Sequence, residues 1–294
     1  MGSSPRAGTT LLAEAMATCF RIDNAVEHES FICTDEPPNG NCMLTKQPGE
    51  IGAVGLPLRL NPDLYVVCLM RDPRDAVVSF HGTRPDVYWC SLKYWKLFVR
   101  KYRKLIRHDR FVVIRYEDFV NKPNTIQDEL MRRIPFLEKL HDFSQYHLYS
   151  RAGKSSQKAM RGVRAIAPAS VGVWKKHLPR IKEQMKTHGD ISGDLIEFGY
   201  EPDREWLSSL KDVEPGRFVT HTDGFFTWRF ILRRKTSGLR EAVNILIRRT
   251  GLDPIRVFGP QGQISAGLGR VVVFPRRILA RGRRVIRKLI SSGS

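Results

Sequence analysis

Residues 2–10, Gly2-Ser3-Ser4-Pro5-Arg6-Ala7-Gly8-Thr9-Thr10, decide the fold class of this chain. The two glycines let the backbone turn tightly, and Arg6 supplies a fixed positive charge. Apolar residues recur at helical spacing over residues 9–20, which predicts a helix directly after the loop. Because the free N–H groups at a helix start attract anions, and two threonine hydroxyls stand beside them, the stretch predicts a cradle for a phosphate or sulfate group.

The loop differs from the Walker A loop of nucleotide triphosphatases. Its glycines are one residue further apart, and no Gly-Lys-Ser/Thr follows them. Without that lysine, the pattern argues against a nucleotide triphosphatase. An ordinary glycine turn that caps a helix is the alternative interpretation of the loop taken alone.

A second charged segment follows a buried strand. Residues 64–70 (LYVVCLM) and 111–114 (FVVI) are continuous apolar runs, typical of strands covered on both faces. Directly after the first run comes Arg71-Asp72-Pro73-Arg74-Asp75-Ala76-Val77-Val78-Ser79, at the edge where open α/β sheets bind ligands. We expect Pro73 to start a helix in which Asp75 and Ser79 share a face, so that Arg71 and Ser79 could reach one phosphate. A solvated helix start with local ion pairs is the alternative.

Charge and composition limit the classes of function that the chain can have. The chain has 294 residues, 41% of them hydrophobic, a net charge of +19 and a pI near 10.1, which together indicate a sizeable core and an anionic partner. The five cysteines form no CxxC pair and favour a reducing compartment. No apolar run reaches the roughly 18 residues that cross a bilayer, and the start lacks a signal-peptide pattern, so we expect a cytoplasmic protein.

Acidic residues are scattered through most of the chain and stop after Asp253. We therefore divide the chain into an α/β domain over residues 1–210 and a basic, mostly helical extension over residues 211–294. The histidines show no HExxH spacing, and His81 is expected on the surface of the helix after Pro73, so we predict no metal site.

The motifs together resemble the family of sulfotransferases that use 3'-phosphoadenosine-5'-phosphosulfate (PAPS). The resemblance combines the loop at residues 2–10 with the segment Arg71 to Ser79. It extends to Arg115-Tyr116-Glu117-Asp118 and to the Ser, Trp-Lys, Leu and Gly-Tyr-Glu pattern over residues 170–201. It implies a P-loop-like three-layer α/β fold with a central parallel sheet flanked by helices. It also implies an enzyme that moves a sulfuryl group to a hydroxyl and releases adenosine 3',5'-bisphosphate (PAP).

By this resemblance, the opening loop would hold the 5'-phosphosulfate, and Arg71 and Ser79 would hold the 3'-phosphate. An arginine fork and a hydroxyl suit a phosphate group. Tyr116 could line the adenosine pocket, or could be an ordinary buried tyrosine. Residues 161–175, with Ser170, could fold over the donor as a lid. The implied donor-binding set is Arg6, Ala7, Gly8, Thr9, Thr10, Arg71, Ser79, Tyr116 and Ser170.

Sulfuryl transfer also needs a base and positive charge near the leaving group. The resemblance favours Glu29, next to His28, as the base, with Glu27 as the alternate; both could instead be solvated loop charges. It also implies that Lys46 neutralises the leaving phosphosulfate bridge, whereas a surface lysine is the alternative. In this family a hydrophobic strand leads into the loop, but here only Met1 precedes Gly2, so we expect a central strand to be missing.

The acceptor is expected to be a saccharide, a glycolipid or a polysaccharide. The aromatic side chains of Tyr88, Trp89, Tyr94 and Trp95 could stack on sugars or belong to the core. The competing hypothesis is a basic protein that binds nucleic acid or a membrane surface. Its support is the tail at residues 266–294, where apolar and basic residues alternate as in an interfacial helix. We expect this tail to contact anionic membranes peripherally, and we expect no nucleic acid.

Overall fold

The computed structural model describes residues 2–4, 6–26, 42–82, 84–225, 238–239 and 242–246. Contacts divide the chain into two units, Met1–Ala242 and Val243–Ser294, and the elements below belong to the first. Most of the predicted extension lies outside the described residues. Its boundary at residue 210 and its mostly helical character therefore stay predictions.

A three-stranded parallel sheet lies at the centre of this unit. Its order is β1 (Gly2–Ser3), β4 (Val66–Met70) and β7 (Phe111–Arg115). Ser3 pairs with Leu69, and Cys68 pairs with Val113. All five residues of β4 are buried, as expected for the middle strand of a covered sheet. Both predicted apolar strands are present, and Gly2 and Ser3 occupy the place of the strand that leads into the loop.

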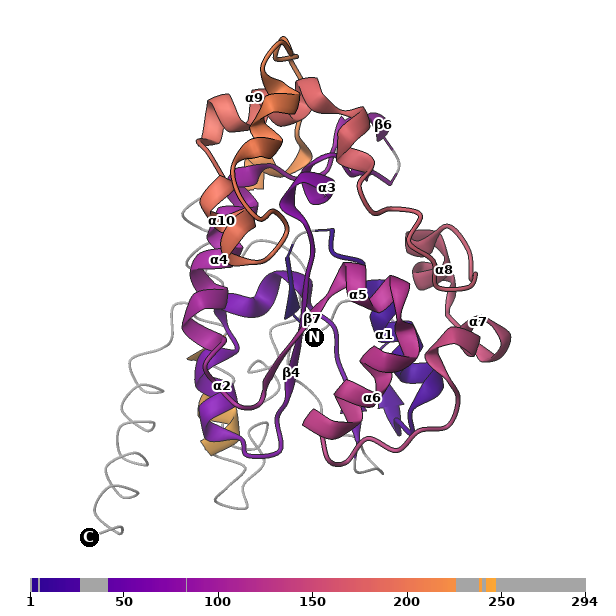
Figure 1. Cartoon of the computed structure of the whole chain (residues 1–294). Coiled ribbons are helices and arrows are strands. Elements are labelled where there is room, and N and C mark those ends of the chain that lie inside the picture. The colour runs from indigo at the N-terminus through magenta and orange to yellow at the C-terminus, as the bar shows by residue number, and fades with distance from the viewer. Residues whose placement is uncertain are drawn as a thin grey trace, which may run out of the picture. The chain divides into compact units, whose positions relative to one another are not determined.

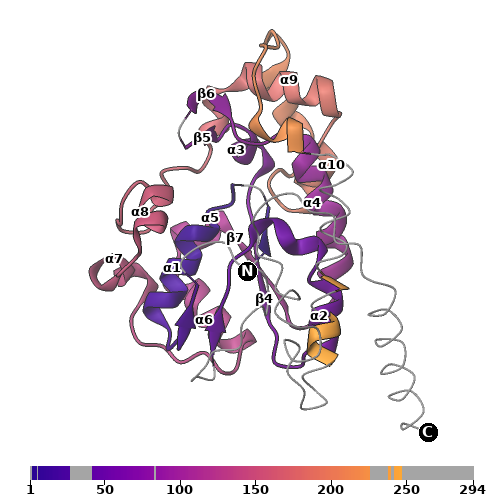
Figure 2. The same cartoon turned by 180° about the vertical axis from the view of Figure 1, so that it is seen from behind.

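Helices cover both faces of the sheet, as Figures 1 and 2 show. Val67 and Leu69 point toward α1 (Thr9–Cys19), α5 (Tyr116–Asn121) and α6 (Pro123–Arg133), because alternate residues of a strand face opposite sides. Val66 and Cys68 point toward α4 (Leu92–Leu105) and the shorter α2 (Gly55–Leu60). Each fully buried leucine or valine contributes about 1.5–3 kcal/mol through its burial. The predicted three layers are thus present, around a sheet of three strands among the described residues.

A third cluster of buried residues extends the domain beyond the carboxyl end of β4. Trp174 and Trp206 pack there with ring centroids 6.0 Å apart, beside Val77 and Leu195. The elements of this cluster are α3 (Pro73–Val77), β5 (Phe80–His81), β6 (Arg84–Tyr88), η3 (Val173–Lys176), α9 (Leu178–His188), α10 (Ser192–Glu197) and η4 (Glu205–Leu210). The remaining short elements are β2 (Asn24–Ala25), β3 (Met43–Leu44), η1 (Pro48–Gly52), η2 (Phe143–Gln145), α7 (Tyr146–Tyr149), α8 (Lys154–Met160) and η5 (His221–Phe225).

The helix after Pro73 is shorter than predicted. It starts at Pro73 as expected but ends at Val77, so Ser79 follows the helix and His81 lies on strand β5. The cause is a hairpin: the Trp89 N–H donates to the Ser79 carbonyl at 2.8 Å. The prediction that Ser79 and His81 belong to this helix was therefore wrong.

Most described cysteines pack as small apolar side chains. Cys19, Cys68 and Cys90 are buried, whereas Cys42 is half-buried. Cys33 lies outside the described residues. Among the helices that the structure describes, none combines the length and the apolar character needed to span a membrane.

Candidate functional site

The opening loop joins the edge of the sheet to the first turn of α1. The Ser4 N–H donates to the Leu69 carbonyl at 3.0 Å, which continues the pairing of β1 with β4 into the loop. Arg6 and Gly8 both adopt positive φ, at 52° and 84°. A Cβ atom on Gly8 would lie 2.8 Å from Cε2 of Tyr116, so the loop needs glycine here for both its conformation and its space. Ala7, between Arg6 and Gly8, is buried.

Arg71 binds the backbone of two other predicted segments. Its Nη1 donates to the Arg6 carbonyl at 2.8 Å, and its Nη2 donates to the Ser170 carbonyl. Its guanidinium lies over the ring of Tyr116, 4.7 Å from the centroid. Only 7% of Arg71 is exposed, and its Nε has no hydrogen-bond partner among the described residues. Arg71 therefore connects the loop, the Tyr116 ring and the predicted lid.

Ser79 meets the opening loop through Arg6. The Nε of Arg6 donates to Oγ of Ser79 at 2.9 Å, although the two residues are 73 positions apart. The two segments that the family resemblance assigns to the ends of one donor molecule are thus in direct contact. Thr9 and Thr10 begin α1 beside them, and the first turn of α1 contains no acidic residue.

Positive charge is concentrated at this place. Part of the Arg6 side chain is open to solvent, but packing around its guanidinium removes water and lowers its pKa, and the nearby Arg71 and Arg161 lower it further. Like charges that depress one another in this way are relieved when an anion binds between them. The electrostatics therefore fit the anion cradle that the sequence predicts.

The side chain of Lys46 reaches the first turn of α1, next to the opening loop. It is 8% exposed, and its Nζ donates to Oγ1 of Thr10 at 3.0 Å. The surface-lysine alternative is wrong, because a buried ammonium that contacts the first turn of α1 is not a solvated surface group. The position agrees with a cation beside the anion cradle, and its role in the reaction stays a prediction.

Asp72 and Arg74, which follow Arg71 in the chain, belong to a network of ion pairs and hydrogen bonds with distant partners that the sequence did not predict. Arg74 is 2% exposed and forms ion pairs with Asp72 at 2.7 Å and with Glu201 at 2.5 Å. The Asp72 N–H donates to Oε1 of Glu117 at 3.0 Å, and burial raises the pKa of Glu117. The signal in the sequence was the run of four charged residues around Pro73. The alternative of local ion pairs covers the pair of Arg74 with Asp72, but not the distant partners Glu201 and Glu117.

The predicted bases are not placed. Glu27, His28 and Glu29 all lie outside the described residues, so their roles stay predictions. Tyr116 is 6% exposed, in agreement with the buried-tyrosine interpretation, and it packs against Gly8 and Arg71. Within the described ranges, no three His, Cys, Asp or Glu side chains form a group suited to a metal ion.

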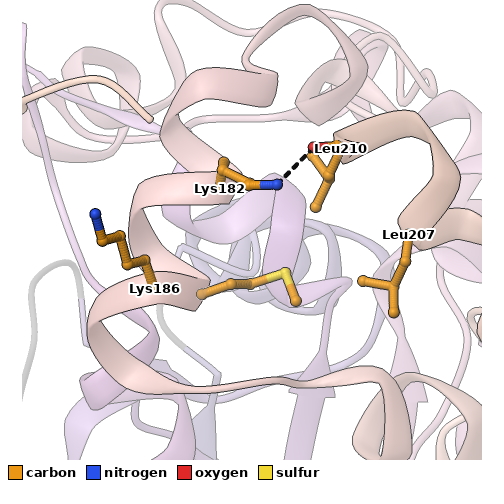
Figure 3. A pocket seen from close by; sticks show the side chains of 5 residues that line it. Lys182, Lys186, Leu207 and Leu210 are labelled. Atoms are coloured by element: carbon orange, nitrogen blue, oxygen red, sulfur yellow. Dashed lines mark hydrogen bonds between the residues drawn. The ribbon is translucent and has the colours of Figure 1, made fainter. Parts of the chain in front are cut away.

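A shallow cavity of about 300 Å³ lies elsewhere, between α9 and η4. Figure 3 shows Leu207 and Leu210 on one side and the two lysines of α9 on the other. Lys182 donates to the Leu210 carbonyl at 2.8 Å, so its ammonium helps to hold η4 on α9. None of the predicted site residues lines this cavity, which we interpret as a packing gap.

The fold and the site together define a class: an α/β protein with an arginine-rich anion cradle, formed by a helix N-terminus at the carboxyl edge of parallel strands. Residues 13–134 match the model of the sulfotransferase family, so this segment is similar to members of that family. No curated protein and no solved structure matches the chain. The matched segment contains Lys46, Arg71, Ser79 and Tyr116. It contains neither the opening loop nor Ser170.

Proposed function

We propose that the protein transfers a sulfuryl group from PAPS to a hydroxyl of a saccharide, glycolipid or polysaccharide and releases PAP. The match of residues 13–134 to the sulfotransferase family model supports the reaction class. The observation that carries the choice of donor is the connected trio of Arg6, Ser79 and Arg71. These contacts bring together the two segments that we propose to bind the 5'-phosphosulfate and the 3'-phosphate of the donor.

The donor capacity of Arg71 fits a phosphate ligand. A guanidinium has five N–H donors, and the two contacts to Arg6 and Ser170 use two of them. One of the remaining donors is Nε, which is buried and unpartnered among the described residues. A phosphate that accepts from it would satisfy a buried polar atom, and such an atom is costly to leave unpaired.

The reaction that we propose is a single in-line displacement. The acceptor oxygen forms a bond to sulfur while the bond from sulfur to the 5'-phosphate oxygen of the donor breaks, and the acceptor proton passes to a base. Catalysis of such a loose transfer depends mainly on positioning and positive charge. Lys46 and the first turn of α1, held together by the bond to Thr10, would stabilise charge on the leaving oxygen. Glu29, with Glu27 as alternate, is our proposed base.

The aromatic side chains proposed to stack on sugars divide into two groups. Trp95 and Tyr88 are 0% and 4% exposed, and Tyr88 stacks on Phe80, so both belong to the core. Trp89 and Tyr94 are half-buried, with ring centroids 6.0 Å apart. We retain only this second pair as a candidate sugar-binding surface.

The donor assignment is tested with the variant Arg71→Ala. We expect this variant to bind PAP about tenfold to a hundredfold more weakly, because it loses charged hydrogen bonds to the 3'-phosphate. Its affinity for adenosine 5'-phosphosulfate, which lacks that phosphate, should change much less. Isothermal titration of the full chain measures both affinities, and Arg100→Ala, an exposed arginine of α4, is the matched control. Equal weakening of both ligands contradicts the contact, and absence of PAP binding and of PAP release from PAPS contradicts the proposed donor.

A further inference from the structure

The segment that follows Ser170 is fastened to the residues that follow strand β4. Its alternate residues carry the contacts: the Ser170 carbonyl accepts from Arg71, the Gly172 N–H donates to Asp75, and the Trp174 N–H also donates to Asp75. These partners are separated by 97 to 99 positions in the chain. We call residues 170–174 the strap.

Both carboxylate oxygens of Asp75 accept hydrogen bonds from the strap. Its Oδ2 accepts from the Gly172 N–H at 2.7 Å, and its Oδ1 accepts from the Trp174 N–H at 2.9 Å. The residue is 1% exposed, so the carboxylate is withdrawn from water. Burial of a carboxylate is unfavourable unless hydrogen bonds compensate it, and here two backbone donors do so. Gly172 has φ of 72°, a conformation that favours glycine and that turns the strap toward the carboxylate.

The strap is also held by its tryptophan. The guanidinium of Arg74 lies over the ring of Trp174, 4.1 Å from the centroid, and 4.9 Å from that of Trp206. Arg74 is itself fixed by ion pairs with Asp72 and Glu201. Two neighbouring residues of α3 therefore hold the strap: Asp75 binds its backbone, and Arg74 contacts the side chain of Trp174.

Arg71 connects the strap to the anion cradle. Its two terminal nitrogens donate to the carbonyls of Ser170 and Arg6, so its guanidinium plane is held between the strap and the loop. If the strap leaves α3, Arg71 loses one of these two supports. Its orientation toward a ligand then becomes less defined, although no atom of Asp75 has to touch that ligand.

From these contacts we infer that Asp75 is a positioning residue: by clamping Gly172 and Trp174 to α3 it holds the Ser170 carbonyl against Arg71, and so orders the guanidinium that binds the 3'-phosphate. This inference rests on the proposed function for the identity of the ligand. The two hydrogen bonds from Gly172 and Trp174 to Asp75, which we call the clamp, do not depend on that function. The two parts are therefore tested by separate measurements.

The first measurement is hydrogen exchange at the amides of Gly172 and Trp174. In the unsubstituted protein both amides should be protected, and exchange as fast as that of an exposed amide at either position overturns the clamp. In Asp75→Asn one carboxylate oxygen becomes an NH₂ donor that cannot accept from a backbone N–H. We expect both amides to exchange at least about tenfold faster in this variant. Unchanged exchange contradicts the clamp.

The second measurement concerns the ligand. We expect Asp75→Asn to raise the Kd for PAP and the KM for PAPS by about tenfold, equivalent to about 1.4 kcal/mol. We expect kcat and the affinity for adenosine 5'-phosphosulfate to change less than about twofold. A general loss of structure would weaken both ligands together. The control is Asp63→Asn, the same change at an exposed aspartate before β4.

The outcomes separate the two proposals. If the unsubstituted protein fails to bind PAP while the amides respond as expected, the proposed donor is wrong and the clamp stands. If the protein binds PAP and Asp75→Asn binds it equally well, the positioning role is wrong. If Asp75→Asn does not fold, protection of Gly172 and Trp174 in the unsubstituted protein still tests the clamp. In that case Trp174→Phe, which keeps the backbone N–H, tests the effect of a loosened strap on PAP affinity.

Discussion

Gly8 is the residue at which the geometry of the loop permits the least change. Its φ of 84° disfavours any other residue, and an added Cβ would meet the ring of Tyr116 at 2.8 Å. We therefore expect Gly8→Ala to lower the free energy of unfolding by about 1–3 kcal/mol, the usual cost of a strained backbone position. Because the ring of Tyr116 also contacts Arg71, the variant should bind PAP more weakly. Urea unfolding and titration measure the two effects.

A second glycine provides the control for Gly8. Gly193 lies within α10 without positive φ, and nothing lies within 4 Å of a Cβ added there. Gly193→Ala should be neutral or stabilise the protein by up to about 1 kcal/mol, because alanine loses less conformational freedom in a helix. If Gly8→Ala proves as stable as Gly193→Ala, the loop conformation described above is wrong.

At the scale of single elements, α1 can be tested as an anion-binding helix independently of PAP. Its first turn has no acid and lies beside Arg6, so inorganic sulfate should bind there. At a sulfate concentration about ten times its Kd, we expect a rise in Tm of about 2–4 °C relative to chloride at equal ionic strength.

Sulfate also stabilises proteins by exclusion from their surface, so the informative comparison is with Arg6→Ala. The non-specific part of the shift should persist in this variant, and the specific part should disappear. An identical sulfate shift in both proteins would show that the cradle does not bind the anion. Thermal unfolding in matched salt series measures the difference.

Some bounds of strands and helices could be predicted from the sequence, and others could not. Strands β4 and β7 were predictable because their apolar runs are continuous, and the start of α3 because proline suits a first turn. The end of α3 was not predictable, since the Ser79 carbonyl is bound by Trp89 in a hairpin that local propensity does not reveal. The contact of Arg6 with Ser79 was not predicted either, because the resemblance assigned the two residues to different ends of the donor.

The role of Asp75 shows a second limit. Its two partners lie 97 and 99 positions away, and no local pattern distinguishes a carboxylate that binds distant backbone from one that is solvated. The burial of Lys46 could not be predicted either, because a lysine before Gln-Pro is typical of a surface loop. Only the structure shows its contact with Thr10. Residue types, spacing and the family resemblance thus gave a set of candidate site residues, whereas the contacts among those residues needed the structure.

At the scale of the whole molecule, the net charge of +19 is larger than one donor site requires. Residues 266–294 hold seven arginines, one lysine and no acid, so their removal lowers the net charge to +11. We propose that this tail attaches the enzyme to anionic membrane surfaces. Each basic residue near such a surface contributes about 1 kcal/mol, and the attraction is screened by salt.

Deletion of residues 266–294 should therefore reduce binding to vesicles that contain phosphatidylserine by at least about tenfold at low salt, with little binding of either protein to phosphatidylcholine alone. PAP affinity should be unchanged, because every described contact of the anion cradle lies before residue 175. Vesicle sedimentation across a salt series measures the first effect, and titration measures the second. Equal vesicle binding with and without the tail contradicts the proposal. Tail-dependent binding to duplex DNA without vesicle binding would instead favour the nucleic-acid alternative, because phosphate contacts in both cases depend on salt but only the vesicle offers an apolar interface.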